Sequence, residues 1–280
     1  MTSTAPIRPL NVGNVVSAAI SLYRTNFKTY TGLGAKAILW YLVPVYGWAR
    51  SLMIMGQIGR MGFKELNREP EQPPEALRQV EPKLWSFLGV AFLVGMIGFG
   101  VSIATSIAST IALFPIMALS FLGDVGAVLG GLLNVVIQLA AFAVQLWFQA
   151  RFWLYDLFIA VETDEESVQS IGRSWQMTQG NAFRVQAVLV ISYLIMLPLY
   201  LLTFSPLLLT IPFFGALASD NPDPVAGLVV LVAALAIFVL ILLASIIAIP
   251  FFQAIKAVLY YDLRSRREGL DLTLGDRGTA

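Results

Sequence analysis

The residues best suited to chemistry lie near the C-terminal end of the chain, where residues 260–271 read YYDLRSRREGLD. The carboxylate of Asp262 stands there beside Tyr261 and the basic side chains of Arg264 and Arg266. Carboxylates and tyrosines act as general acids or bases, and arginine binds anionic groups. At such short helical spacings, opposite charges also pair with one another on a solvated face. We therefore predict an ion-pair network here in preference to an active site.

The chain contains no cysteine and no histidine. This composition removes disulfides, thiolate and imidazole metal ligands, and the commonest general acid or base. No nucleophile and base stand together in a recognisable motif. We therefore predict no catalytic residue, no cofactor and no metal site. A membrane-embedded enzyme is the least favoured of the three functions that we weigh.

The distribution of charge identifies the solvent in which these residues must work. Only 12% of the 280 residues are charged, against about 25% in a soluble domain. Four apolar stretches separate the charges, and each exceeds the ~20 residues that cross a ~30 Å hydrocarbon core as a helix. They run from Lys83 to Asp124, from Asp124 to Arg151, from Arg184 to Asp220 and from Asp223 to Lys256. The sequence predicts an all-α membrane protein with four transmembrane helices in two hairpins.

The first hairpin is predicted at residues 84–162. As one helix, Leu84–Gly123 would be ~60 Å long, about twice the hydrocarbon core. We therefore predict a span that ends near Thr105, with a break at the glycines around position 98 or at Pro115. Val125–Val161 is predicted as one long helix that crosses the membrane and then projects beyond it.

The second hairpin is predicted at residues 182–263, with a polar tail at 264–280. We expect a span over 182–202, and Pro206 and Pro212 should interrupt the chain after it. The last long helix should run from Pro224 to Leu263, with a kink at Pro250.

Two amphipathic helices are predicted to lie at the membrane surface. The first covers Asn11–Phe27, with Asn11 as its N-cap and apolar residues on one face. The second belongs to the linker at residues 163–181, where Thr163 and Glu166 form a capping box and Gly180 ends the helix.

The N-terminal unit, residues 1–67, contains a membrane segment of ambiguous length. Within Tyr30–Gly59 the longest charge-free run is Ala37–Ala49, bracketed by Lys36 and Arg50 and interrupted by Pro44. This run is too short for a standard span. We favour a re-entrant helical pair, and a fifth or sixth span is the alternative. Residues 68–83 are predicted to form an exposed cytoplasmic loop.

The basic residues indicate the orientation of the hairpins. They gather near both termini, in the first loop and in the central linker, whereas the hairpin tips carry only Asp124, Asp220 and Asp223. Lysine and arginine are retained on the cytoplasmic side. We therefore predict that both hairpins enter and leave on the cytoplasmic side and that both termini are cytoplasmic. The membrane would be the bacterial inner membrane or one derived from it, and we expect no cleaved signal peptide.

An aromatic residue precedes a basic one by one helical turn at three places, Tyr46 before Arg50, Trp147 before Arg151 and Phe252 before Lys256. The pattern indicates either an internal repeat or the ordinary preference of these residues for interfaces. Asp156 is predicted to pair with Arg151 or Lys256 and so to join helix ends. Our candidate contacts for lipid or a partner are Trp175, Arg173, Tyr23, Arg24, Arg50, Arg151, Lys256, Tyr261, Asp262, Arg264 and Arg266.

The interiors of the predicted spans offer amides and hydroxyls, such as Gln138, Gln145 and Ser192, in place of ionisable groups. In hydrocarbon these groups usually bond neighbouring helices, and small residues such as those of Gly126–Gly131 allow close helix packing. Carriers place ionisable groups inside the membrane to couple ions or substrate. Proton-coupled transport is therefore disfavoured.

Three short motifs resemble a known group of proteins. They are RPL with LYRTNF near the N-terminus, Ser174-Trp175 followed by Thr178, Gly180 and Asn181, and the YYDLRSRREGLD stretch. Together the chain resembles a broad group of poorly characterised bacterial membrane proteins, related to the membrane domain attached to some glycerophosphoryl diester phosphodiesterases. The resemblance implies a helical membrane module and supplies no catalytic residues.

We therefore expect a membrane protein without a catalytic site that serves as a scaffold, assembly or accessory factor. Its partners would be membrane lipids or another integral membrane protein or complex, and not nucleic acid. A transporter or lipid-translocating subunit is the alternative. A polar cavity that reaches the middle of the membrane would favour the transporter, whereas an apolar lateral groove would favour the scaffold or lipid-binding role.

Overall fold

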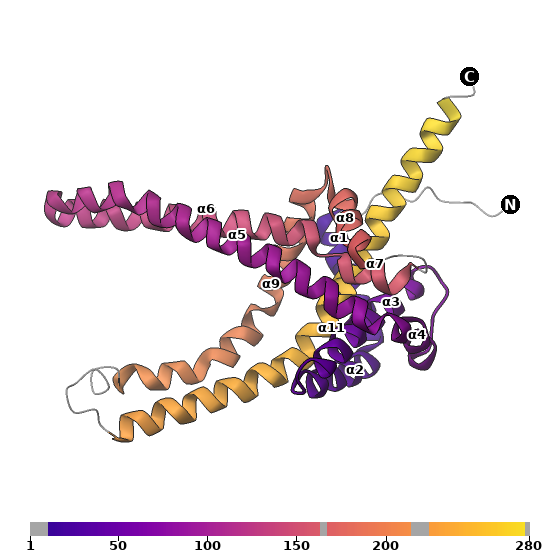
Figure 1. Cartoon of the computed structure of the whole chain (residues 1–280), viewed down its shortest axis with the longest axis horizontal. Coiled ribbons are helices and arrows are strands. Elements are labelled where there is room, and N and C mark those ends of the chain that lie inside the picture. Colours follow the sequence, from indigo (N-terminus) through magenta and orange to yellow (C-terminus); the bar gives the residue numbers. More distant parts are fainter. Residues whose placement is uncertain (1–10, 163–166, 214–223, 278–280) are drawn as a thin grey trace.

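A computed structural model describes residues 11–162, 167–213 and 224–277, and every element in these residues is helical (Figure 1). Four stretches are long and apolar enough to cross a membrane, which confirms the four predicted spans: Pro73–Ile116, Gly123–Val161, Ala182–Phe213 and Pro224–Arg266. The α-helices are α1 (Val12–Thr25), α2 (Phe27–Tyr41), α3 (Tyr46–Leu66), α4 (Pro73–Val80), α5 (Leu84–Leu119), α6 (Gly123–Phe152), α7 (Tyr155–Val161), α8 (Ser167–Thr178), α9 (Ala182–Phe204) and α11 (Pro224–Arg277). Three 3₁₀ helices are η1 (Glu81–Lys83), η2 (Ser120–Leu122) and η3 (Ser205–Phe213).

The two hairpins, α5–α6 and α9–α11, diverge from a common base (Figure 1). Helices α1 to α4, α7 and α8 gather at this base, away from the hairpin tips. Large apolar side chains such as Phe99, Phe114, Leu201 and Leu231 are exposed along the hairpins. Surfaces of this kind suit lipid, because a soluble monomer rarely exposes large contiguous apolar patches.

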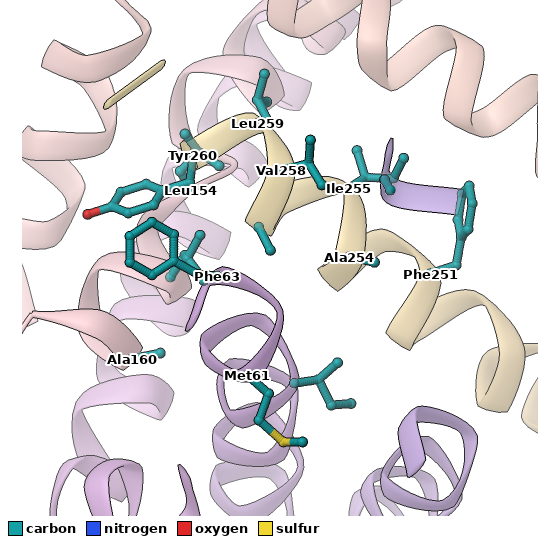
Figure 2. Close-up of a cluster of buried hydrophobic side chains, with 14 of the residues drawn as sticks. Met61, Phe63, Leu154, Ala160, Phe251, Ala254, Ile255, Val258, Leu259 and Tyr260 are labelled. Atoms are coloured by element: carbon teal, nitrogen blue, oxygen red, sulfur yellow. The ribbon is translucent and has the colours of Figure 1, made fainter. Parts of the chain in front are cut away.

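The hydrophobic core lies at the base, where the C-terminal half of α11 is surrounded by other helices. Figure 2 shows Phe251, Ile255 and Tyr260 of α11 in this cluster, together with Phe63 of α3 and Leu154, which precedes α7. The ring of Tyr260 meets Phe63 at 5.0 Å and Phe158 at 5.1 Å, both edge to face. The base is therefore packed like a soluble domain, whereas most large apolar side chains of the hairpins are exposed.

Helix α5 runs without interruption from Leu84 to Leu119 and passes through Pro115, so the predicted break at the glycines around position 98 or at Pro115 is wrong. In hydrocarbon a broken helix would leave backbone N–H and C=O groups without partners, which costs several kcal/mol per group. One proline removes a single hydrogen bond. A continuous, long helix is therefore the cheaper solution.

The long helix predicted over Val125–Val161 is interrupted between α6 and α7, at Trp153 and Leu154. The hydroxyl of Ser174 in α8 explains the interruption. It donates to the carbonyl of Arg151 at 2.9 Å and accepts from the backbone N–H of Leu154 at 3.3 Å. These backbone groups would otherwise bond within one continuous helix, and a buried serine from another helix replaces their partners.

Helices also form in the predicted loop and in the polar tail. The expected loop at 68–83 contains α4 and η1, because Pro73 suits the first helical position and Ala76 and Val80 share a buried face. The expected polar tail continues α11 as far as Arg277. Asp262 and Arg266 pair four residues apart at the start of this extension, which supports a helix there.

The amphipathic helix predicted at Asn11–Phe27 forms as α1, and Asn11 caps it by accepting from the N–H of Asn14 at 2.7 Å. Its apolar face, however, packs on α9 and α11, so protein covers this face in place of lipid. That α1 lies at the membrane surface stays a prediction. Gly180, with a φ of +79°, follows α8 as predicted. The capping box at Thr163 and Glu166 lies outside the described residues.

The segment Tyr30–Gly59 forms a helical hairpin of α2 and α3 with a turn at residues 42–45 that contains Pro44. Neither helix is among the four candidate spans. Helix α2 crosses α11 at Gly34, where an added Cβ would lie 2.7 Å from the carbonyl oxygen of Ile246. That carbonyl lies four residues before Pro250, which has no N–H to donate to it. The close approach of α2 therefore uses the gap in the α11 hydrogen-bond ladder.

The tip of the first hairpin depends on small residues, as the Gly126–Gly131 run predicted. A Cβ at Gly126 would lie 1.7 Å from the carbonyl oxygen of Leu119, whereas a Cβ at Gly131 would meet nothing within 4 Å. Gly126→Ala should therefore separate α5 from α6 and cost about 1–3 kcal/mol, and Gly131→Ala should not destabilise the hairpin. Thermal unfolding of the two variants in the same detergent measures the difference, and equal midpoints would contradict this account.

Candidate functional site

The short helix α7 occupies the junction of the two hairpins and is buried along most of its length. At its N-terminal end, Asp156 is 5% exposed. Its Oδ2 accepts from Nζ of Lys256 at 2.6 Å and from Nε2 of Gln253 at 2.9 Å, both on α11. The predicted pairing of Asp156 with Lys256 is confirmed. This pair ties the first hairpin to the second, because α7 continues from α6.

The C-terminal end of α7 is held by two cations from other elements. Arg60 of α3 donates to the carbonyl of Ala160 at 2.8 Å, and Lys83 of η1 donates to the carbonyls of Ile159, at 2.8 Å, and Glu162. The last carbonyls of a helix lack partners within it, and its C-terminal end favours cations. A carboxylate at one end and cations at the other therefore fix α7 in the base.

Arg60 makes a second, stronger contact. Its Nε and Nη2 donate to the two carboxylate oxygens of Glu71 at 2.8 and 2.7 Å. The Arg60 side chain is 9% exposed and that of Glu71 is 17% exposed. This paired geometry is the strongest that arginine and a carboxylate form, and it fixes the segment between α3 and α4 against α7.

Further ion pairs join Glu162, at the end of α7, to α8 and join α11 to α9. Glu162 pairs with Arg173 of α8 and accepts from the hydroxyl of Tyr260 at 3.0 Å. Asp262 is 3% exposed and accepts from Arg184 of α9 at 2.9 Å and from Arg266 at 3.0 Å. The predicted ion-pair network is therefore present. We expected this network on a solvated face, but Asp262 is buried.

Arg151 pairs with aromatic rings and not with Asp156. Its guanidinium lies 5.1 Å from the ring centre of Trp147 and 4.5 Å from that of Trp175, and it donates to the backbone carbonyl of Trp175 at 3.3 Å. The aromatic-basic turn at Tyr46 behaves similarly, with Arg50 5.7 Å from the Tyr46 ring. These contacts are cation–π interactions, and at Trp175 they fix α8 on α6.

Two pockets of about 460 Å³ each lie at the junction, and both are lined by Trp153 and Lys256. The first lies between α5 and α6 and includes Gln145, Gln149 and Tyr155 among apolar residues. The second lies between α9 and α11 and includes Tyr193, Tyr200, Thr203 and Ser245. Most of the residues that line each pocket are apolar, so each pocket offers mostly apolar walls with a few polar groups.

The structure distributes the predicted contact residues over several environments. Arg24 and Arg173 are exposed, and Arg50, Arg151, Trp175, Tyr261, Arg264 and Arg266 are partly buried. Tyr23, Lys256 and Asp262 are buried, and Lys256 lines both pockets. Tyr23 donates to the carbonyl of Ile247 at 3.3 Å, and burial raises the pKa of its hydroxyl to about 12. Arg264 lies 5.9 Å from the ring of Phe63.

Sequence reasoning missed Arg60 and the glycines of α3. Cβ atoms added at Gly56, Gly59 and Gly62 would meet Phe87 of α5 at 2.4 Å, Leu157 of α7 at 2.9 Å and Ala257 of α11 at 3.1 Å. The spacing of three residues aligns these glycines along the helix. This G-x-x-G-x-x-G pattern was a signal that several elements approach α3 closely.

The chain belongs to a protein family described as a domain of unknown function (DUF7847), whose pattern matches residues 75–263. The match extends from α4 through both hairpins to the ion pairs of α11. No curated protein and no solved structure matches the chain.

Proposed function

We propose that this protein is a non-catalytic module of the bacterial cytoplasmic membrane that binds lipid or another membrane protein, as a scaffold, assembly or accessory factor. The observation that carries the proposal is the pair of pockets at the junction where the hairpins diverge. Concave, mostly apolar sites with a few polar groups are typical of ligand sites. In a bilayer, the molecules that meet such a lateral opening are lipids and the helices of other proteins.

The use of charge at the base supports a binding role over catalysis. Asp156, Asp262, Glu71 and Glu162 each pair with a cation from another element. Carboxylates bound in this way hold helices together and keep the base rigid while the hairpins contact the membrane. The resemblance to membrane domains attached to phosphodiesterases also fits a module that serves a partner activity.

The distribution of basic residues supports an orientation with the base in the cytoplasm. The base collects Arg60, Lys83, Arg184 and Lys256, whereas the tip of the first hairpin carries Asp124 in the first turn of α6. By the preference of lysine and arginine for the cytoplasmic side, both termini are assigned to the cytoplasm. In this orientation the α2–α3 hairpin enters the cytoplasmic leaflet and does not cross the bilayer.

The pocket in the first hairpin can be filled by a single substitution. Gly98 lines it and a Cβ there would meet nothing within 4 Å, and Gly95 one turn earlier has equal room but lies outside the pocket. We expect Gly98→Phe to reduce the lipid or protein that co-purifies with the full chain in nanodiscs, measured by mass spectrometry. Gly95→Phe should leave it unchanged. Wild-type protein that carries neither lipid nor partner would overturn the proposal.

A lipid-translocating subunit is the second candidate, favoured by Lys256, which lines both pockets and pairs with Asp156. A polar pair flanked by apolar grooves offers a headgroup a place to pass while the acyl chains stay in lipid. Vesicles that contain the purified chain and a fluorescent phospholipid distinguish the two functions. Faster bleaching of the inner-leaflet lipid by an external reductant would favour translocation.

A further inference from the structure

The turn between α2 and α3 carries a group of exposed aromatic and aliphatic residues. We call this group the tip of the α2–α3 hairpin; it comprises Leu39, Trp40, Tyr41, Leu42, Val43, Val45, Tyr46 and Trp48, all exposed. Tryptophan and tyrosine prefer the headgroup level of a bilayer. The position of Tyr46 fits this level, because its ring lies 6.5 Å from that of Trp85, in the first turn of the membrane helix α5.

A pocket of about 270 Å³ lies beside this tip, between α2, α3 and α4. It contains two basic side chains, Lys36 and Arg50, next to Trp40 and the apolar residues Leu33 and Leu77. Among the described residues that line it, none is acidic. The pocket therefore carries positive charge beside an apolar rim.

The two cations have room to take an anionic ligand. Lys36 is exposed, and within the described residues it forms no ion pair or hydrogen bond. Arg50 pairs with Glu81 at 3.2 Å, but the Glu81 side chain is 53% exposed, and such exposed pairs are weak. The guanidinium of Arg50 also lies 5.8 Å from the ring centre of Trp40, and the rings of Trp40 and Tyr46 together hold it in place.

We propose that this pocket binds the phosphate group of an anionic phospholipid, while the tip of the α2–α3 hairpin sits among the headgroups. A soluble anion would need only the cations. The exposed apolar rim offers an apolar surface for an acyl chain to pack on, so a lipid fits both the cations and the rim. The proposal rests on the membrane placement of the hairpins and names a lipid class for the proposed function, but it does not use the pockets beside Lys256.

The test compares charge removal inside and outside the pocket. Full-length protein in detergent would be titrated with phosphatidylglycerol and followed by native mass spectrometry. A basic residue near a membrane surface adds ~1 kcal/mol, so we expect Lys36→Gln/Arg50→Gln to weaken the tightest site roughly 30-fold. The matched variant Lys28→Gln/Arg78→Gln removes two exposed charges from α2 and α4, and it should bind as the wild type does. Equal weakening in both variants would overturn the proposal.

Two further arms identify the ligand. Phosphatidylcholine and inorganic phosphate should each fail to displace phosphatidylglycerol, and displacement by inorganic phosphate would overturn the lipid assignment in favour of a free anion. If the Arg50 variant does not fold, Lys36→Gln alone should weaken binding and Glu81→Gln should strengthen it, since Glu81 competes for Arg50. Failure of this site would leave the Gly98 result intact, so the two proposals fail separately.

Discussion

Replacing Lys256 with methionine is expected to lower the free energy of unfolding by about 3–5 kcal/mol. The substitution keeps most of the side-chain volume but leaves the carboxylate of Asp156 buried without its cation. Gln253 still donates one hydrogen bond to Asp156, which offsets little of the cost of an unpaired buried charge. Thermal unfolding in a mild detergent, followed by tryptophan fluorescence, measures the loss.

The double variant Asp156→Asn/Lys256→Met separates the charge from the packing. With both charges absent, no unpaired ion remains, and replacing a buried pair by neutral groups is often close to neutral. We expect the double variant to recover more than half of the stability that Lys256→Met loses. A double variant as unstable as the single one would show that shape, and not charge, makes this contact important.

The number and grouping of the membrane helices could be predicted from the sequence. A helix that crosses the hydrocarbon core needs about 20 apolar residues, so each long stretch without charged residues indicates a span. The pair between Asp156 and Lys256 was also predictable, since a carboxylate and a lysine at the ends of apolar helices need each other. Whether lipid or protein covers the apolar face of α1 could not be predicted. Its apolar face would suit lipid or protein equally, and Tyr23 and Val16 are covered by protein.

The contacts that shape the base join residues far apart in the chain, and periodicity contains no information about them. Ser174 interrupts the helix at Leu154 through a buried hydroxyl, and the sequence around Leu154 shows no helix-breaking residue. Asp262 looked like a member of a local network, but Arg184 approaches it from α9. Such pairings need the tertiary arrangement before they can be recognised.

The short, buried helix α7 obtains partners for both of its ends from other elements. A helix of seven residues has few internal hydrogen bonds, so most of its terminal groups need partners from elsewhere. Asp156 at its start and the carbonyls of Ile159 and Ala160 at its end obtain them from α11, η1 and α3. Helix α7 therefore joins the two hairpins, because it continues from one hairpin and binds the other.

Arg60→Met is expected to be the second strongly destabilising substitution, at about 3–5 kcal/mol. It removes both hydrogen bonds to Glu71, which is largely buried, and the bond to the carbonyl of Ala160. The carboxylate and one end of α7 lose their partner together. Beyond a lower unfolding midpoint, we expect faster amide hydrogen exchange in α7 and α4 than in α9, because the loss is local.

Lys64→Met provides the matched control. Lys64 lies one helical turn further along α3 and also pairs with a glutamate, Glu69, at 2.7 Å. The hydrogen bond from Lys64 lowers the pKa of Glu69, and the lysine charge adds to this effect, but Glu69 is exposed. Water replaces the lost partner there, so no measurable change in the unfolding midpoint is expected. Equal effects of the two substitutions would show that the position in α3 decides the outcome, and not the burial of the charge that is left behind.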